Sequence, residues 1–280
     1  KRFAKPILYY WMVVSSFKIF GVSLASARIP SAIFGTLSIG LVFLLGRKLF
    51  DSRVGLLSLF LLPTTYLHFQ ISRWSTTDMA MSFFILLSLY LFVLLYKTNF
   101  QKITYTYLFY ISMGLGFMVK GPPAILIPGL TILVFLTATK RKNWFLDLHI
   151  GKGLIILSMI ILPWFAAMFW MHGVEFTNHI IGNEIKNRLV HNTPFSFYYV
   201  RVLFRYQLPW SLFFLFAVLK QFGFLEPINS KDMGFIERIK GLGKKFAAHV
   251  KLLFKEGNES LAFCYTWIVV CLVLFILLRV

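Results

Sequence analysis

The chain has 280 residues, of which 58% are hydrophobic and 18% aromatic, and its mean hydropathy is +0.75. These values exceed what the core of a soluble domain of this length needs, so they exclude a soluble protein and indicate a polytopic membrane protein. The formal charge is +19, but the basic residues fall in short clusters between apolar runs, which indicates lipid headgroups and excludes nucleic acid as the partner.

Long apolar runs divide the chain into predicted membrane-spanning helices. Because a helix needs about 20 apolar residues to cross the hydrocarbon core, the runs predict an all-α, polytopic transmembrane helix bundle of about eight helices. In chain order, these helices are expected at 29–49, 54–72, 79–96, 103–119, 122–138, 152–171, 201–219 and 261–278.

The connectors between the runs predict the orientation of the chain. One set is rich in lysine and arginine, which places it on the cytoplasmic side by the positive-inside rule. The other set, at 1–28, 72–78, 120–123 and 172–200, is then on the outer side. The predicted organisation is the end of a first outer loop (1–28), a transmembrane core (29–219) with an outer loop (172–200), a cytoplasmic basic segment (220–258) and a further transmembrane helix (261–278).

Two further expectations concern the chain ends and the basic segment. The chain begins at Lys1 rather than methionine, and its last apolar run stops at Arg279-Val280 as if cut, so we expect a fragment of a longer transmembrane domain. Within 231–255, apolar residues recur at helical spacing between lysines. This pattern predicts an amphipathic helix on the anionic cytoplasmic leaflet.

One acidic side chain marks the outer end of a predicted helix. In the stretch RWSTTDMAMSFF, Asp78 is the only acidic residue between Asp51 and Asp147. A carboxylate at the start of a hydrophobic helix indicates a polar site on the outer face. The alternative is that Asp78 is only a helix N-cap, which is worth about 1 kcal/mol.

The outer side also carries basic residues against the positive-inside rule. Beside only Glu175 and Glu184, the region 172–205 holds Lys186, Arg188, Arg201 and Arg205. Three more cations, Lys5, Arg73 and Lys120, stand at other outer helix ends. Together these cations predict a binding site for an anion. The simplest ligand is a phosphate group, with Asp78 beside it. The alternative for Lys5, Lys120 and Arg188 is that each snorkels to lipid headgroups.

Two other groups of residues have weaker functional interpretations. His172, Glu175 and His179 share helical spacing, but this is a weak metal signature, so no metal site is predicted and a divalent cation as cofactor is left open. Tyrosines such as Tyr9 and Tyr10 are typical of an aromatic belt at the membrane interface, and contact with substrate is the alternative.

Several sequence blocks occur in a specific order across residues 5–211. They are KPILYYW, SARIPSAIFG, LLGRKLF, RWSTTDMAMSFF, GLGFMVKGPPAILIP, PW, NEIKNRL with HNTPFSFYY, and LPWS. In this order the blocks resemble those of the GT-C glycosyltransferases of family 39 type, a group similar to protein O-mannosyltransferases and the bacterial lipid A aminoarabinose transferase.

The resemblance implies an enzyme that moves a sugar from a polyprenyl-phosphate carrier to an acceptor hydroxyl, on a lipid or a protein, with inversion at the anomeric carbon. It also implies a bacterial inner (plasma) membrane location, with the active site facing the periplasm or exterior. The leaving lipid phosphate needs cationic partners. The family's phosphate-binding lysine falls on Lys5 and its loop arginine on Arg188, and we add Lys120 and Arg73 as donor-phosphate contacts.

The acceptor hydroxyl needs a carboxylate base. The resemblance places the principal base in an outer loop upstream of KPILYYW, and gives Asp78 the role of orienting the acceptor or that base. Ala4 stands where relatives often have glutamate, which removes a side chain that a metal site would use. The candidate substrate contacts are Tyr9, Tyr10, Glu184, His191 and Tyr199.

Two other classes of protein fit the same residues. A transporter or flippase of lipid-linked sugars also needs outer cations, but transporters place charges near the bilayer midplane, whereas these cluster at helix ends. A membrane scaffold has snorkelling cations only, so binding of polyprenyl phosphate would distinguish it from the enzyme.

Overall fold

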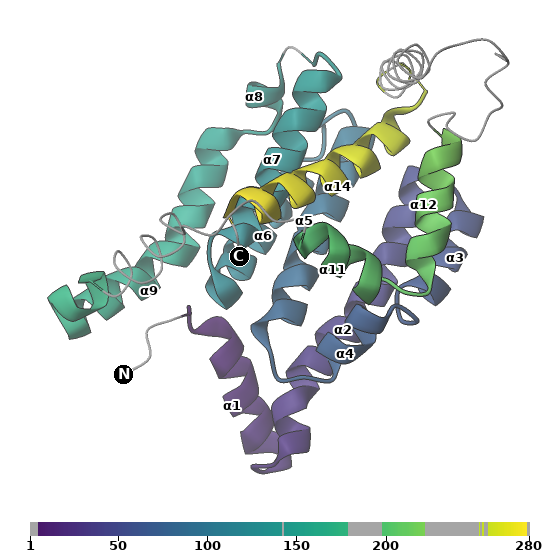
Figure 1. Ribbon diagram of the computed structural model, residues 1–280. Helices are drawn as coiled ribbons and strands as arrows, with labels where there is room; N and C mark the ends of the chain where they lie inside the picture. The colour runs from purple at the N-terminus through teal and green to yellow at the C-terminus, as the bar shows by residue number, and fades with distance from the viewer. Residues whose placement is uncertain are drawn as a thin grey trace, which may run out of the picture.

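The computed structural model describes residues 5–141, 143–178, 198–221, 252, 254 and 257–278, and every regular element among them is an α-helix. Figure 1 shows the elements from the N-terminus to the C-terminus. They are α1 (Leu8–Phe20), α2 (Leu24–Leu49), α3 (Ser52–Leu61), α4 (Tyr66–Ser72), α5 (Thr77–Lys97), α6 (Ile103–Lys120), α7 (Pro123–Ala138), α8 (Trp144–Asp147), α9 (Ile150–Asn178), α11 (Tyr198–Tyr206), α12 (Trp210–Gln221) and α14 (Glu259–Leu278).

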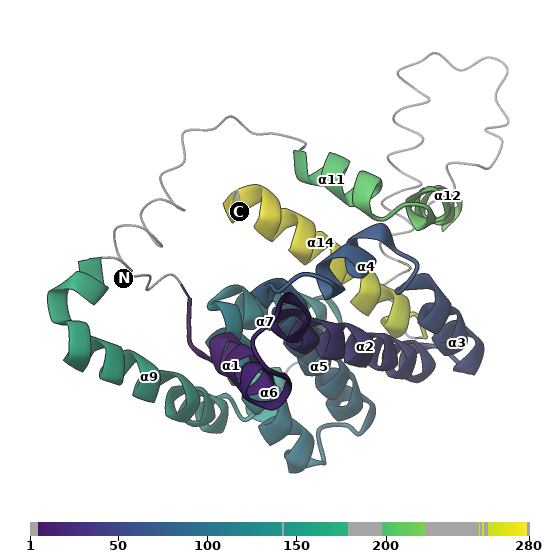
Figure 2. The same cartoon turned by 90° about the horizontal axis from the view of Figure 1, so that it is seen from below.

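Helices α5, α6 and α7 form the centre of the bundle. Helix α2 packs against α5 on one side and against α3 on the other, while α9 packs against α6 and α14 against α7. Helix α1 rests on α2 and α6. Figures 1 and 2 show α9 along one side of the molecule and α3 with α12 on the opposite side.

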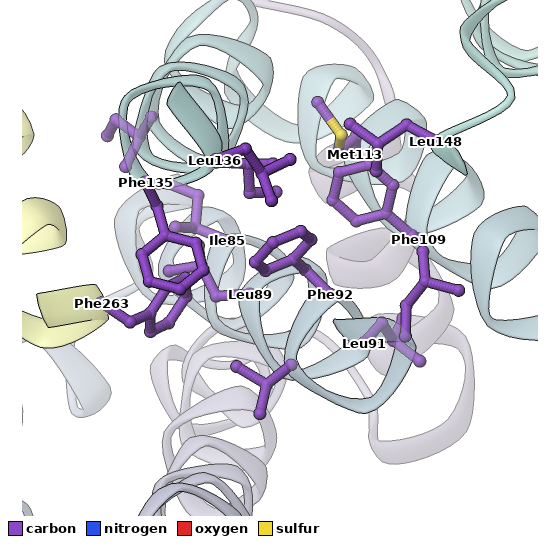
Figure 3. Packing of buried hydrophobic residues seen from close by; sticks show 14 of the residues in the cluster. Ile85, Leu89, Leu91, Phe92, Phe109, Met113, Phe135, Leu136, Leu148 and Phe263 are labelled. Carbon is purple, nitrogen blue, oxygen red and sulfur yellow. The ribbon is translucent and has the colours of Figure 1, made fainter. Parts of the chain in front are cut away.

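Aromatic side chains join α14 to the centre although the two are far apart in sequence. The ring of Phe263 in α14 stacks on Phe92 of α5, with ring centroids 5.8 Å apart, and meets Phe135 of α7 edge to face at 5.3 Å. All three rings are almost fully buried, at 1 to 2% exposure, and Figure 3 shows them together in the core. Such aromatic pairs contribute about 0.5 to 1.5 kcal/mol beyond area burial.

The contact between α5 and α6 is close because small residues line it. Ser88 donates a hydrogen bond to Ser112 across the two helices (3.0 Å), and Ser112 donates to the carbonyl of Phe84 (3.0 Å). A Cβ on Gly116 would lie 2.9 Å from the Cβ atoms of both Phe84 and Ala124. Small residues and interhelical hydroxyl bonds are the usual means by which helices pack in membranes. This packing brings the start of α5 and the end of α6 to the same end of the bundle.

The number of long apolar helices is smaller than the sequence predicts. Within the described ranges, α2, α5 and α9 are long and apolar enough to cross a membrane, and α3 with α4, bent by 65°, would add a fourth. Of the other expected spans, α7 and α12 are helical but shorter, α6 is less apolar, and α14 covers its expected range 261–278. Among the described residues, fewer helices pass this test than the about eight spans that the sequence predicts, so the number of spans stays a prediction, although each apolar run is mainly helical.

Two predicted helices are broken. The run 54–72 is interrupted between α3 and α4, where Pro63 lacks a backbone N–H, and the run 201–219 is interrupted at 207–209, which includes Pro209. Proline ends helices because it removes a hydrogen bond and clashes with the preceding turn. The hydropathy pattern does not predict these breaks, because the residues on both sides of each break are apolar.

Other predicted boundaries also move. Residues 1–28, expected as loop, contain α1 and the start of α2, where the hydroxyl of Ser23 accepts from the N–H of Ser26 as an N-cap. Helix α9 runs past 171 to Asn178, with Gly173 in a non-helical conformation (φ 49°, ψ −127°). Apart from residues 252 and 254, the predicted amphipathic segment 231–255 lies outside the described residues.

Candidate functional site

The start of α5 carries the carboxylate that the sequence singles out. Thr76 is the N-cap residue, its side chain makes no capping hydrogen bond, and Asp78 lies in the first turn of the helix. The interpretation of Asp78 as an N-cap is therefore wrong. A carboxylate in the first turn is still favoured by the helix dipole, by about 0.3 to 1 kcal/mol, so this position supplies a charge without using its oxygens for capping.

Lys120 meets Asp78 from the end of α6. Its Nζ donates to Oδ1 of Asp78 in an ion pair whose lysine and aspartate side chains are 25% and 40% exposed. Helix α6 ends directly afterwards at Gly121, whose φ of +100° favours glycine. A lysine in the last turn complements the negative end of its helix. The partly exposed pair is open to an incoming ligand.

Lys5 reaches the same helix start from the segment before α1. Its Nζ donates to the hydroxyl of Thr77 at 3.4 Å, and Thr77 is the residue next to Asp78. The structure thus brings Lys5, Asp78 and Lys120 together at one end of α5. Two ammonium groups beside a carboxylate provide the charges needed to hold a phosphate and to orient a hydroxyl.

A buried serine holds the segments that carry these residues. Ser31 of α2 is 0% exposed; its hydroxyl lies 2.7 Å from that of Tyr9 in α1 and donates to the carbonyl of Thr76 (3.2 Å). The Thr76 N–H donates back to Ser31 at 3.4 Å. Since the one hydroxyl hydrogen of Ser31 goes to Thr76, Tyr9 must donate to Ser31. Sequence reasoning missed Ser31, because a serine inside an apolar run gives no signal of its partners.

The other predicted site residues are placed less closely together. Tyr9 is buried and bonded to Ser31, whereas Tyr10 is 49% exposed. The guanidinium of Arg73 lies 5.0 Å from the ring centroid of Phe69. Tyr199 belongs to α11. The substrate contacts of these tyrosines stay predictions, as do the roles of residues outside the described part of the chain, namely Glu184, Arg188 and His191.

The structure also bears on the weak metal signature. Among the described residues, no three His, Cys, Asp or Glu side chains gather closely enough to hold a metal ion. His172 and Glu175 lie in α9, while His179 is outside the described ranges. The three-residue signature is therefore not tested as a whole.

Known proteins with similar sequences are longer than this chain. An undecaprenyl phosphate-alpha-4-amino-4-deoxy-L-arabinose arabinosyl transferase of Pseudomonas fluorescens is 30% identical over 238 residues, covering 79% of this chain and 41% of the relative. The corresponding transferase of Wigglesworthia glossinidia brevipalpis is 32% identical over 230 residues, covering 78% and 40%. The chain therefore spans less than half the length of these curated relatives.

A solved structure shares the fold. The crystal structure of ArnT from Cupriavidus metallidurans bound to undecaprenyl phosphate matches with a TM-score of 0.71 at 20% identity, covering 96% of this chain and 49% of that one. The chain therefore has the GT-C membrane fold of that protein. The protein-family model for dolichyl-phosphate-mannose-protein mannosyltransferases matches residues 4–168. Because this match covers more than half of the residues, the chain belongs to the dolichyl-phosphate-mannose-protein mannosyltransferase family.

Proposed function

We propose that the chain is part of a membrane glycosyltransferase that moves a sugar from a polyprenyl-phosphate carrier to an acceptor hydroxyl. The observation that carries this proposal is the meeting of Lys5, Asp78 and Lys120 at the start of α5. The relatives named as undecaprenyl-phosphate aminoarabinose transferases support it and favour a pentose as the sugar. The matched ArnT structure, which holds undecaprenyl phosphate, supports the carrier class.

The two lysines serve the leaving group. As the bond between the anomeric carbon and the phosphate oxygen breaks, its electron pair passes to that oxygen. Cations that already face the phosphate then bind more strongly than in the ground state, which lowers the barrier. Lys5 contacts Thr77 and Lys120 contacts Asp78, and these contacts support this role. Arg188 is proposed as a further phosphate contact from the outer loop, on the sequence resemblance alone.

Asp78 serves the acceptor side. In the structure its Oδ1 is occupied by Lys120. A bound phosphate competes for the lysine, which frees the carboxylate to accept a hydrogen bond from the acceptor hydroxyl. The acceptor oxygen then attacks the anomeric carbon on the face opposite the phosphate, so the configuration inverts, and its proton passes to a carboxylate base. Asp78 is proposed to orient the hydroxyl or that base.

The site is proposed to face the periplasm or exterior of the bacterial inner membrane. Asp78 and Lys120 lie at helix ends next to the short connectors 73–76 and 121–122, in which Arg73 is the single lysine or arginine. At the opposite end, the connector between α5 and α6 carries Lys102, and the connector after α7 carries Lys140, Arg141 and Lys142. By the positive-inside rule, the latter are cytoplasmic.

A transfer assay on the full-length protein tests this function. A synthetic polyprenyl-phosphate-linked aminopentose is supplied to proteoliposomes, and mass spectrometry follows free polyprenyl phosphate and the sugar-modified acceptor fraction. We expect both products, and a raised KM for the donor in Lys5→Gln, whereas Lys97→Gln at the opposite end of α5 should leave KM unchanged. Movement of the intact donor across the bilayer without release of polyprenyl phosphate would contradict the transferase function and indicate a flippase.

A further inference from the structure

A second candidate binding site lies between α4 and the connection from α11 to α12. It is a cavity of about 870 Å³, and its lining includes Pro63, Tyr66, Phe69, Arg205, Tyr206 and Leu208. Figures 1 and 2 show α4 beside α11 and α12, while α1 lies on another part of the bundle. None of the described helices that form this cavity carries Lys5, Asp78 or Lys120.

The walls of the cavity are held together by specific contacts. The N–H of Tyr66 donates to the carbonyl of Leu208 (3.4 Å), and the indole N–H of Trp210 donates to the hydroxyl of Thr64 (2.8 Å). The rings of Tyr66 and Tyr206 face each other from the two walls, with centroids 5.8 Å apart. These contacts join residues 63–69 to residues 206–210, so the two walls of the cavity are linked by the protein itself.

The chemistry of the cavity combines an aromatic surface with exposed positive charge. Arg205 lines the cavity, and the guanidinium of Arg73 lies over the ring of Phe69, another lining residue. Both arginines are exposed, and within the part of the chain that the structure describes neither forms an ion pair. The lining contains no aspartate or glutamate. An anion with an apolar body is the ligand that matches such a surface.

We propose that this cavity binds a phosphate-bearing membrane lipid. Guanidinium groups bind phosphate oxygens through paired, charge-assisted hydrogen bonds, so Arg205 and Arg73 take the headgroup. The aromatic rings of Tyr66, Phe69 and Tyr206 cover the adjoining part of an aliphatic chain. A free phosphate ion would leave this apolar lining without a partner. The inference separates Arg73 from the donor-phosphate contacts and does not depend on sugar transfer.

Binding measurements on the full-length protein in detergent test the inference. The probes are dioctanoyl phosphatidic acid, dioctanoylglycerol, which lacks the phosphate, and inorganic phosphate. We expect phosphatidic acid to bind best. Arg205→Gln and Arg73→Gln should each raise its Kd about tenfold, because a hydrogen bond to a charged group is lost. Arg53→Gln removes a guanidinium that is also exposed, on α3 and outside the cavity lining, and should leave the Kd unchanged.

Cross-linking locates the bound lipid independently of the variants. A phosphatidic acid with a photoreactive acyl chain should label peptides that contain residues 63–69 and 205–209. Equal binding of dioctanoylglycerol would overturn the role of the phosphate, and equally tight binding of inorganic phosphate would overturn the lipid. Loss of phosphatidic acid binding in Lys5→Gln, with Arg205→Gln unaffected, would place the lipid at the proposed donor site instead and overturn the cavity assignment.

Discussion

Asp78 combines a structural contact with exposure to a ligand, and the two can be separated by substitution. Asp78→Asn keeps the shape of the side chain but removes its charge. We expect turnover to fall about 10- to 100-fold, the equivalent of one charge-assisted hydrogen bond. The free energy of unfolding should fall by only about 1 kcal/mol or less, the usual effect of a charge in the first helical turn. Steady-state kinetics and thermal unfolding in detergent measure the two effects.

A second carboxylate in the chain provides the control for this experiment. Asp147 of α8 pairs with Arg141 at 2.8 Å, and its side chain has comparable exposure. Asp147→Asn should therefore match Asp78→Asn in stability while leaving turnover unchanged. If Asp78→Asn instead unfolds at lower temperature and the folded fraction has full activity, Asp78 has a structural role only.

Ser31 gives a prediction about positioning. Ser31→Ala removes the acceptor of the Tyr9 hydroxyl and a partner of the Thr76 backbone, and an unsatisfied buried group costs about 1 to 3 kcal/mol. Because α1 follows Lys5 and α5 carries Asp78, we expect kcat to fall as well. Ser38→Ala is the matched control, since Ser38 is also buried on α2 and, among the described residues, its hydroxyl bonds only to the Phe34 carbonyl of its own helix. Equal kcat in the two variants would show that Ser31 contributes to stability alone.

The sequence predicted part of this site because charge is conspicuous in an apolar chain. Lys5, Asp78 and Lys120 stand at helix ends that the sequence predicts to be on the outer side, and antiparallel helices bring such ends together. Ser31 could not be found in this way, because its partners lie 22 and 45 residues away and serine is common inside membrane helices. The cavity at Arg205 could not be predicted from the sequence either, since its walls come from two segments that are far apart in the chain.

At the scale of elements, the separation between α5, α6 and α7 depends on one glycine. Gly116→Ala would place a Cβ 2.9 Å from both Phe84 and Ala124, so the helices must move apart. Overpacking of this kind costs about 1 to 3 kcal/mol. Gly129→Ala on α7 is the control, because no atom outside its own helix lies within 4 Å of the added Cβ. We expect a lower unfolding temperature for Gly116→Ala only; the same shift in both variants would contradict close packing at Gly116.

Helices as elements were predictable from apolar runs, whereas their ends were not. Every predicted run is mainly helical in the described ranges, because a helix satisfies the backbone hydrogen bonds of an apolar segment in a bilayer. The breaks at Pro63 and at Pro209 are local backbone effects inside runs that remain apolar. The start of α2 depends on the Ser23 and Ser26 capping bonds, which a hydropathy pattern cannot detect.

At the scale of the whole molecule, the proposed donor site and the proposed lipid cavity lie at the same end of the bundle. Arg73 is the C-cap of α4, and Asp78 follows within the first turn of α5, so a segment of only a few residues joins the two sites. The ligands proposed for the two sites both dissolve in the bilayer. The arrangement allows a lipid to reach each site laterally from the membrane, without crossing it.

The orientation of the bundle gives the last prediction. Ser75 lies in the turn between α4 and α5, next to the proposed donor site, and Gln101 lies in the turn between α5 and α6; both are exposed. In a variant with Cys264 and Cys271 replaced by alanine, single cysteines are introduced as Ser75→Cys or Gln101→Cys. A membrane-impermeant maleimide is then applied to right-side-out vesicles. Because Lys97 and Lys102 flank Gln101, the positive-inside rule places that turn in the cytoplasm.

We therefore expect Ser75→Cys to be labelled in intact vesicles and Gln101→Cys only after permeabilisation. Labelling of both variants after permeabilisation confirms that each thiol is accessible in the folded protein. The reverse pattern would place Lys5, Asp78 and Lys120 on the cytoplasmic face. It would contradict transfer on the outer face but not the family membership, because the family was established from sequence and the fold from the structure.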